Sequence, residues 1–360
     1  MVFSLNRTWS GPAASIRTCL RSVAAGAAII SSEPFEHGQA VRYPAPAKGI
    51  FHATCLNSLG DWLASEIGKL PRPDLLVAHK LTIEGIAVQR AARILGLPFA
   101  VSIQGNTDEK ILAARPDLRR RFARIFHEAA IVFPFTPWAM SAVEAKLGRR
   151  RGAVQLLPAP TDLDSALEPA KGNGTIVSAF HLRNHKIKNL SGLAAAAKVL
   201  REQGEDVAIA IAGGGAESEL VECQHIVRGT RISLAGSKSR EEMPKFLNQA
   251  SGFVLPSLRE SFGVVFTEAL FAGLPVIYPA GAAIDGYFDD CPFAIRVDAR
   301  DTAAIAAAIR RLLQEEETLK AEIAVWQKSD AAKRFQRHRI AQDFASGLLR
   351  GLYESRTVAS

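Results

Sequence analysis

Two glutamates, Glu260 and Glu268, lie in the segment of this sequence that is richest in residues able to do chemistry. The apolar run at residues 252–255 predicts a buried strand before them, and residues 263–272 predict a helix after a short loop. The free N–H groups and the dipole at the start of that helix would attract an anion such as a diphosphate. The segment therefore predicts an anion site flanked by two carboxylates.

The two carboxylates would act differently because they lie at different places. Glu260 in the loop could accept hydrogen bonds from ligand hydroxyls, beside Gly263, whose missing Cβ lets a ligand approach the backbone. The alternative for Glu260 is a charge that only favours the helix dipole. Glu268 would lie about one and a half turns into the helix, where a carboxylate can accept two hydrogen bonds from a vicinal diol. Because that helix is apolar, this charge needs a specific partner.

A basic loop forms the second candidate site. It follows a strand predicted at residues 175–179 and contains Arg183, Lys186 and Lys188. Cations at this place could stabilise the negative charge that a leaving diphosphate gains in the transition state. The alternative is that this loop is basic only because it is exposed to solvent, with no role in binding. This alternative is strongest for Arg183.

Apolar runs of strand length alternate with helical spacings through most of the chain. Strands are predicted at residues 75–78, 99–103, 130–133, 154–157, 175–179, 207–212, 231–235, 252–255 and 275–278. The alternation predicts an α/β fold with parallel sheets and helices on both faces, in which ligands bind beyond the carboxyl ends of the strands.

The length of 360 residues favours two domains over a single core. Residues 166–174 have the Pro, Gly and Asn content of a linker. We expect a doubly wound, Rossmann-like domain at residues 1–165 and a second at residues 175–330. A C-terminal helix at residues 331–354 is expected to pack back on the first domain.

The composition excludes several classes of protein. Apolar residues make up 48% of the chain and charged residues 22%, as in ordinary soluble proteins, and no apolar run reaches the roughly 20 residues that cross a bilayer. The arginines of residues 1–30 give a faint resemblance to a transit peptide, but we expect a folded unit there. The widely spaced cysteines argue against disulfides or zinc and favour a reducing, cytoplasmic compartment. They are Cys19, Cys55, Cys223 and Cys291.

The net charge of +8 lies almost wholly in the first half, where residues 1–165 hold 20 Lys and Arg against 13 Asp and Glu. Its basic cluster consists of Arg115, Arg119, Arg120, Arg121 and Arg124, with residues 149–151 later in the chain. The cluster predicts docking to an anionic membrane, at about 1 kcal/mol per basic residue. Nucleic acid is disfavoured because aromatic residues are not interleaved with the charges. The alternative is a solvated helix face.

The residues around the two glutamates resemble the Glu-x7-Glu signature of family 4 glycosyltransferases. The matching residues are Pro256-Ser257, Glu260, Phe262-Gly263, Glu268-Ala269 and Ala272-Gly273-Leu274-Pro275-Val276. This string is highly specific, and weaker similarity covers residues 70–353. The resemblance implies a GT-B fold, with two Rossmann-like domains facing a central cleft, and a retaining transfer of sugar from a nucleotide diphosphate sugar.

The resemblance also implies roles for individual residues. In this family the first glutamate and the Phe-Gly amides hold the donor sugar, and the second glutamate holds the ribose. The diphosphate-binding lysine corresponds to Lys188, whereas the family's Gly-Arg is missing and Arg183 is the substitute, with Lys186 second. The predicted catalytic residues are Glu260, Arg183 and Lys188. The predicted donor-binding residues are Glu260, Ser261, Phe262, Gly263, Val264, Glu268, Gly213, Gly214, Ser237 and Lys188.

The run Gly213-Gly214-Gly215 ends a predicted strand. It is not a nicotinamide fingerprint, because Ser218 stands where that motif requires glycine. We interpret the run as a tight turn beneath the nucleotide, and Ser237, after the next strand, as a residue whose backbone meets the base.

The acceptor side departs from the family pattern. Gln104-Gly105 stands where the family has His-Gly, and a single Gly11 replaces its N-terminal Gly-Gly loop, so Gln104, Gly105 and Gly11 are the predicted acceptor-side residues. Gln104 can form hydrogen bonds but cannot act as a base. Retention in this family is usually explained by front-side attack, in which the leaving diphosphate takes the acceptor proton. His79 and His37 stay weaker alternatives as a base.

No cofactor or metal is expected. The segment Asp162-Leu-Asp164 looks like the Asp-x-Asp metal motif of the other glycosyltransferase fold. Its place at the domain seam favours a structural role, because magnesium and manganese sites lie beside phosphates.

The predicted function is a retaining transfer of sugar from a nucleotide diphosphate sugar to a hydroxyl of a glycan or glycolipid, in polysaccharide or cell-envelope synthesis. The predicted partners are the donor, a glycan or lipid-linked acceptor and an anionic membrane, and the predicted place is the cytoplasm or the inner face of the membrane. The alternatives are another GT-B enzyme, such as a nucleotide-sugar epimerase, and a non-catalytic assembly protein that binds nucleotide sugar.

Overall fold

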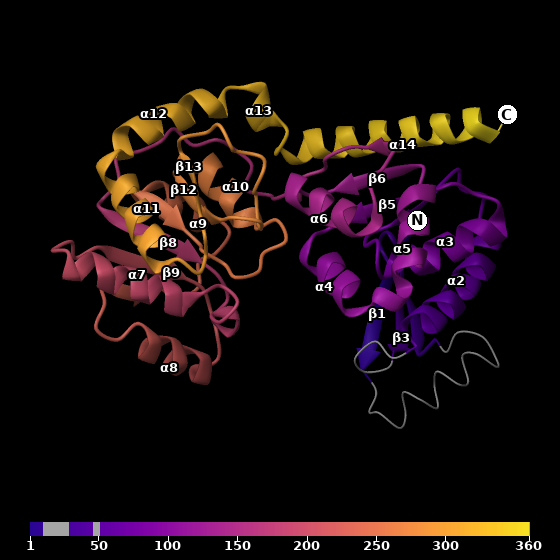
Figure 1. Cartoon of the computed structure of the whole chain (residues 1–360), viewed down its shortest axis with the longest axis horizontal. Coiled ribbons are helices and arrows are strands. Elements are labelled where there is room, and N and C mark those ends of the chain that lie inside the picture. The colour runs from indigo at the N-terminus through magenta and orange to yellow at the C-terminus, as the bar shows by residue number, and fades with distance from the viewer. Residues whose placement is uncertain (10–28, 46–50, 360) are drawn as a thin grey trace.

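The computed structural model describes residues 1–9, 29–45 and 51–359. Their strands form three sheets, with the orders β1-β3-β2, β4-β5-β6-β7 and β10-β9-β8-β11-β12-β13. Figure 1 shows two lobes, of which the first holds the two smaller sheets and the second holds the six-stranded sheet. Cys19 and the predicted acceptor-side Gly11 lie outside the described residues.

The first lobe contains the strands β1 (Val2–Trp9), β2 (Ser31–Phe35), β3 (Gly38–Ala45), β4 (Leu76–Ala78), β5 (Phe99–Ile103), β6 (Ile131–Pro134) and β7 (Ala153–Val154). Its helices are α2 (His52–Gly68), α3 (Glu84–Leu95), α4 (Asn106–Ala114), η2 (Pro116–Leu118), α5 (Arg119–Glu128) and α6 (Pro137–Leu147).

The second lobe contains the strands β8 (Thr175–Ala179), β9 (Ala208–Ala212), β10 (Ile232–Leu234), β11 (Gly252–Val254), β12 (Val276–Pro279) and β13 (Ala294–Val297). Its helices are η3 (Leu182–Asn184), α7 (Leu190–Glu202), α8 (Glu217–Ile226), α9 (Met243–Asn248), α10 (Val264–Phe271), α11 (Thr302–Gln314), α12 (Glu316–Gln327) and α13 (Asp330–Lys333). The last helix, α14 (Arg337–Ala359), runs back along the first lobe (Figure 1).

The two larger sheets are wholly parallel, as the alternation of strands and helices predicts. β5 and β6 are buried along their whole length, which is typical of parallel strands covered by helices on both faces. The predicted α/β fold class, with a parallel sheet in each of two domains, is therefore confirmed.

Several elements differ from the prediction. β1 pairs in parallel with β3, and β2 forms an antiparallel hairpin with β3, in a sheet of their own. No strand is predicted at β2, because its residues are mostly exposed and give no apolar run. The helix expected at residues 331–354 is divided into α13 and α14, and α14 continues beyond residue 354 to Ala359.

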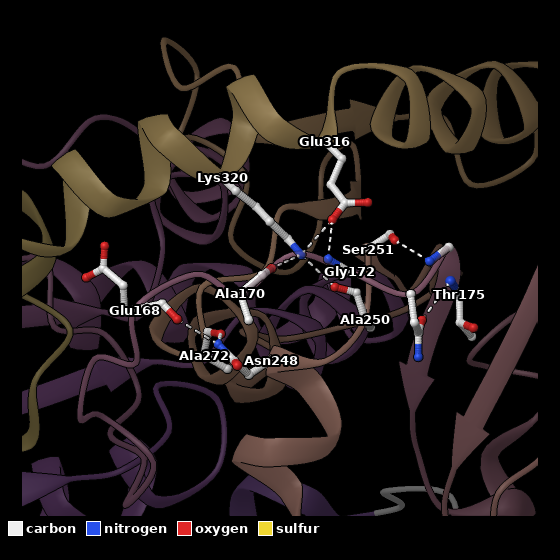
Figure 2. Close-up of polar contacts among 12 residues, drawn as sticks. Glu168, Ala170, Gly172, Thr175, Asn248, Ala250, Ser251, Ala272, Glu316 and Lys320 are labelled. Atoms are coloured by element: carbon white, nitrogen blue, oxygen red, sulfur yellow. Dashed lines mark hydrogen bonds and ion pairs between the residues drawn. The ribbon is translucent and has the colours of Figure 1, made fainter.

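Figure 2 shows how the segment predicted as a linker is fixed to the second domain. Lys320 of α12 is buried, and its ammonium group donates hydrogen bonds to Ala170 O at 2.6 Å and to Ala250 O at 2.8 Å. It also pairs with Glu316 Oε1 at 2.9 Å, and the same oxygen accepts a hydrogen bond from Gly172 N at 2.6 Å. This part of the segment is therefore attached firmly to the second domain.

Helix α14 joins the C-terminal part of the chain to the first domain. The ring of Phe344 lies 5.1 Å from that of Phe133 in β6, and Gln155 Nε2 donates a hydrogen bond to Asp343 O at 2.7 Å. The chain therefore crosses between the domains twice, once before the segment of Figure 2 and once between α13 and α14.

Replacing Lys320 by alanine should lower the free energy of unfolding by about 2–4 kcal/mol. The substitution leaves Ala170 O, Ala250 O and the Glu316 carboxylate without their buried cation. Urea unfolding followed by circular dichroism measures the change, with Lys328→Ala, an exposed lysine just after α12, as the matched control. Equal stability of the two variants would contradict this role for Lys320.

Candidate active site

The predicted site residues follow strands whose carboxyl ends meet between the two domains. His79, Gln104 and Phe135 follow β4, β5 and β6 in the first domain. Phe135 O accepts a hydrogen bond from Tyr287 OH of the second domain at 2.8 Å, so the domains are in contact at this edge. In the second domain, β8 pairs with β11, and the loops that follow these two strands are therefore neighbours.

These neighbouring loops bring Lys188 and Glu260 together, although 72 residues separate them in the chain. Lys188 Nζ forms an ion pair with Glu260 Oε2, and the two side chains are only 19% and 14% exposed. Leu258 N donates a hydrogen bond to Ile187 O at 2.8 Å, which fixes the loops beside the pair. Asn189, with a φ of 60°, then turns the chain into α7.

Helix α10 begins beside this pair. Its N-cap, Gly263, has a φ of 70°, and no side chain of the described residues caps the helix. A Cβ at this position would lie 2.8 Å from the ring of Phe266 and 3.0 Å from Glu260 Cγ, so both conformation and space require glycine. An uncapped helix start beside a partly buried cation is a suitable place for an anion.

The residues on either side of Gly263 offer their backbone more than their side chains. Phe262 is buried, and its ring packs edge-on against Tyr287 at 6.3 Å. Ser261 and Gly263 are partly exposed and Val264 is exposed, so a ligand can reach this stretch of the chain.

Glu268 lies in an apolar helix, and its carboxylate has a hydrogen-bond partner in Thr161. Its Oε1 accepts a hydrogen bond from Thr161 Oγ1 at 2.6 Å, and the same hydroxyl oxygen accepts one from Leu163 N at 3.1 Å. Burial raises the pKa of the Glu268 carboxyl, and the nearby charge of Asp162 adds to this effect. The partner comes from the crossing between the domains, beside a cavity of about 160 Å³ that Glu268 helps to line.

The other predicted cations lie differently. Arg183 is exposed, and within the described part of the chain its guanidinium group has no hydrogen-bond or ion-pair partner. Lys186 pairs with Glu222 of α8 at 3.2 Å, so its charge is already engaged. Arg183 therefore remains the better candidate for a second diphosphate cation beside Lys188.

Gly213 and Gly214 lie where backbone segments come close together. A Cβ on Gly213 would overlap Phe180 O, and one on Gly214 would overlap Ser237 Oγ. Ser237 therefore lies beside the glycine turn, near the loop that begins after β8. The predicted nucleotide-side residues thus gather around the carboxyl ends of β8, β9 and β10.

The loop that carries Gln104 is held by a buried carboxylate, Asp108, that no sequence pattern singles out. Gln104 N donates a hydrogen bond to Asp108 Oδ2 at 3.1 Å. Asp108 Oδ1 accepts two more from Thr82, from its N at 3.0 Å and its Oγ1 at 2.8 Å. Asp108 is fully buried, and burial raises its pKa to about 6. In the sequence it looks like an ordinary acidic residue in the first turn of a helix.

The two histidines considered as alternative bases occupy different surroundings. His79 follows β4, and its ring lies 6.1 Å from that of Phe135. Burial, with the charge of Lys80, lowers the pKa of His79, which keeps it neutral at neutral pH. His37 is exposed in the turn between β2 and β3, 3.9 Å from the Glu36 carboxylate.

The carboxylates of Asp162 and Asp164 connect the two crossings between the domains. Asp162 pairs with Arg337 at the start of α14, and its Oδ2 lies 3.0 Å from Arg240 Nη2. Asp164 Oδ2 accepts a hydrogen bond from Arg337 N at 2.6 Å. Both groups are therefore engaged with arginine.

The basic cluster is smaller than the sequence predicts. Arg115 pairs with Asp117 at 2.7 Å, and Arg121 is half-buried and donates to Asn57 Oδ1. Arg150 is buried, where its guanidinium group donates to carbonyl oxygens of the first domain. The exposed arginines on α5 are Arg119, Arg120 and Arg124. None of the helices in the described ranges has the length and apolar character that crossing a bilayer requires.

Residues 163–324 match the family described as Glycosyl transferases group 1. A D-inositol 3-phosphate glycosyltransferase from Nocardioides sp. is 25% identical over 286 residues, which cover 71% of this chain and 58% of that protein. The amylovoran biosynthesis glycosyltransferase AmsK of Erwinia amylovora is 28% identical over 174 residues, which cover 42% and 41% of the two chains. The chain thus spans less than two thirds of the length of these curated relatives.

Solved structures resemble the whole chain. Sucrose-phosphate synthase from Thermosynechococcus elongatus has a TM-score of 0.66 at 18% identity, covering 99% of this chain and 100% of that one. Anabaena HepE, solved in complex with UDP and glucose, has a TM-score of 0.60 at 17% identity, covering 96% and 98%.

The fold is that of a GT-B protein, with two Rossmann-like domains. The segment that carries both glutamates matches the family of group 1 glycosyltransferases, and the resemblance to family 4 seen in the sequence is confirmed.

Asp108 should make stability depend on pH. Because its pKa is raised in the folded state, to about 6 against an ordinary value near 4, its contribution is fully present below pH 4 and is lost as pH rises through 6. The free energy of unfolding of the wild type, minus that of Asp108→Asn, should fall by on the order of 2 kcal/mol between pH 4 and pH 7. A flat or rising difference would contradict burial of an ionisable Asp108.

Proposed function

We propose that this protein is a retaining glycosyltransferase that moves a sugar from a nucleotide diphosphate sugar to a hydroxyl of a glycan or glycolipid. The observation that carries the proposal is the partly buried Lys188–Glu260 pair beside the uncapped start of α10. A cation, a carboxylate and free N–H groups at one point suit a sugar linked to a diphosphate.

The donor would occupy the edge of the second sheet. Its diphosphate would lie at the start of α10, with Lys188 and the exposed Arg183 as counter-charges. Glu268 would accept hydrogen bonds from the ribose hydroxyls, either sharing its carboxylate with Thr161 or giving up that hydrogen bond. Glu260 would hold the donor sugar once the diphosphate takes over part of its interaction with Lys188. The UDP and glucose bound to Anabaena HepE are consistent with such a donor.

The transfer would need positioning more than an enzymic base. The bond between the anomeric carbon and the leaving phosphate oxygen breaks, and the acceptor oxygen forms its new bond on the same face of the sugar. The acceptor proton passes to the departing diphosphate, whose added charge Lys188 and the α10 N–H groups stabilise. This arrangement tolerates Gln104 where the family has histidine, and neutral His79 is the remaining candidate base on the acceptor side.

The acceptor would bind against the first domain, at the loop that holds Gln104 and Gly105. The excess of basic residues in that half of the chain suits an acceptor that carries phosphate. Two acceptor classes are proposed, a phosphorylated polyol and a growing glycan. The first is supported by the name D-inositol 3-phosphate glycosyltransferase and the second by the name amylovoran biosynthesis glycosyltransferase, which two of the relatives carry.

Lys188→Ala should lower kcat by roughly 100-fold or more, because a preorganised charge on the leaving group is lost. Glu268→Ala should instead raise the KM for the donor by roughly 10-fold, with a smaller change in kcat, since the ribose does not react. Steady-state transfer from UDP-, GDP- and ADP-sugars measures both effects. Lys198→Ala, an exposed lysine on α7, is the control, and normal kinetics in both site variants would sink these assignments.

The exposed arginines of α5 should bind anionic membrane. Replacing Arg119, Arg120 and Arg124 by alanine removes about 1 kcal/mol each, so binding to phosphatidylglycerol vesicles should weaken by roughly 100-fold at low salt. Co-sedimentation measures the partition of the protein. The control is a variant that lacks three exposed cations of the second domain, Lys198, Arg228 and Lys328. If both variants bind the vesicles equally, α5 is not the docking face.

A further inference from the structure

Trp138 makes a contact that joins the two domains next to the candidate site. It lies in the first turn of α6, and its indole N–H donates a hydrogen bond to Ala283 O of the second domain at 2.8 Å. One residue before it, Pro137 lies so close to Gly286 that a Cβ on that glycine would meet the proline ring at 2.7 Å. The two backbones therefore meet tightly at this point.

The contact continues to the carboxylate proposed to hold the sugar. Ala283 N donates a hydrogen bond to Glu260 O at 3.2 Å, so the residue held by Trp138 also holds the backbone of Glu260. Ala283 is fully buried and has a φ of 55°, a conformation that costs a residue with a side chain on the order of 1–2 kcal/mol. Strained residues of this kind persist where their surroundings fix them, and they cluster at functional sites.

The loop around Ala283 is stiff. Asp285 Oδ2 accepts a hydrogen bond from Gly281 N at 2.6 Å, and its carboxylate pairs with Arg296 of β13 at 2.7 Å. A shift of Ala283 would therefore be passed to Glu260 rather than absorbed within the loop.

The other side of Trp138 supports the acceptor-side loop. Gly105, with a φ of 99°, lies against the indole, and a Cβ there would come within 2.6 Å of Trp138 Cη2. A single side chain thus contacts the loop proposed for the acceptor and, through Ala283, the carboxylate proposed for the donor sugar.

We propose that Trp138 is a positioning residue that sets Glu260 relative to the acceptor loop, so that the donor sugar and the acceptor hydroxyl are aligned. This inference rests on the proposed transfer reaction. The aligned geometry matters for the step in which the acceptor oxygen attacks, whereas donor binding depends on Lys188, Glu268 and α10. Loss of the indole hydrogen bond should therefore impair transfer more than donor binding.

The test compares Trp138→Phe with Tyr287→Phe. The first keeps a ring beneath Gly105 and removes the N–H. The second keeps the ring that packs against Phe262 and removes another interdomain hydrogen bond, to Phe135 O. With the sugar nucleotide that the wild type uses best, Trp138→Phe should lower kcat for transfer about tenfold, change the donor KM less than threefold, and lower the ratio of transfer to donor hydrolysis. Tyr287→Phe should leave that ratio unchanged.

Hydrogen exchange tests the contact without any turnover. The amides of residues 280–286 should exchange several-fold faster in Trp138→Phe than in the wild type or Tyr287→Phe, since Ala283 loses its anchor. An unchanged transfer ratio in Trp138→Phe, or the same loss in both variants, would overturn the proposal. If the wild type transfers no sugar from any donor, the proposed function fails, and unchanged exchange would then separately refute the role of Trp138.

Discussion

The charge of Glu268 inside the apolar helix α10 is the constraint on which the arrangement of the site depends. Phe266, Ala269, Leu270 and Phe271 are buried around it, so the helix cannot turn this carboxylate to solvent without exposing its core. The chain satisfies the charge with Thr161, which lies in the crossing between the domains. The position of the crossing is therefore tied to the helix whose start forms the candidate anion site.

Several connections among the described residues hold the second domain to its neighbour around that site. Thr161 binds Glu268, and Asp162 and Asp164 engage Arg337 where α14 begins. Trp138 binds the Ala283 loop, and Tyr287 donates to Phe135 O. Residues 168–174 do not act as a flexible hinge, because the hydrogen bonds of Lys320 in Figure 2 fix them to the second domain. Any closure of the domains has to pivot before that segment and between α13 and α14.

The fold and the gathering of residues at the proposed donor site are predictable from the sequence because their signals are local. Buried parallel strands are recognised in the sequence as short apolar runs. Because β8 and β11 are neighbours in the sheet, the loops that follow them lie side by side and bring Lys188 to Glu260. The interactions of Asp108, Thr161 and Trp138 span 26, 107 and 145 residues, and no local pattern reports such pairs. The basic cluster was overestimated for the same reason, since only the fold shows that Arg121 and Arg150 turn inward.

A crystal structure with a bound nucleoside diphosphate, from soaks with UDP, GDP and ADP, would locate the donor site. The distal phosphate is expected to contact the N–H groups at the start of α10 and Lys188 Nζ. The ribose hydroxyls are expected to donate hydrogen bonds to the Glu268 carboxylate. A diphosphate bound away from α10, or a ribose without contact to Glu268, would contradict the proposed donor site.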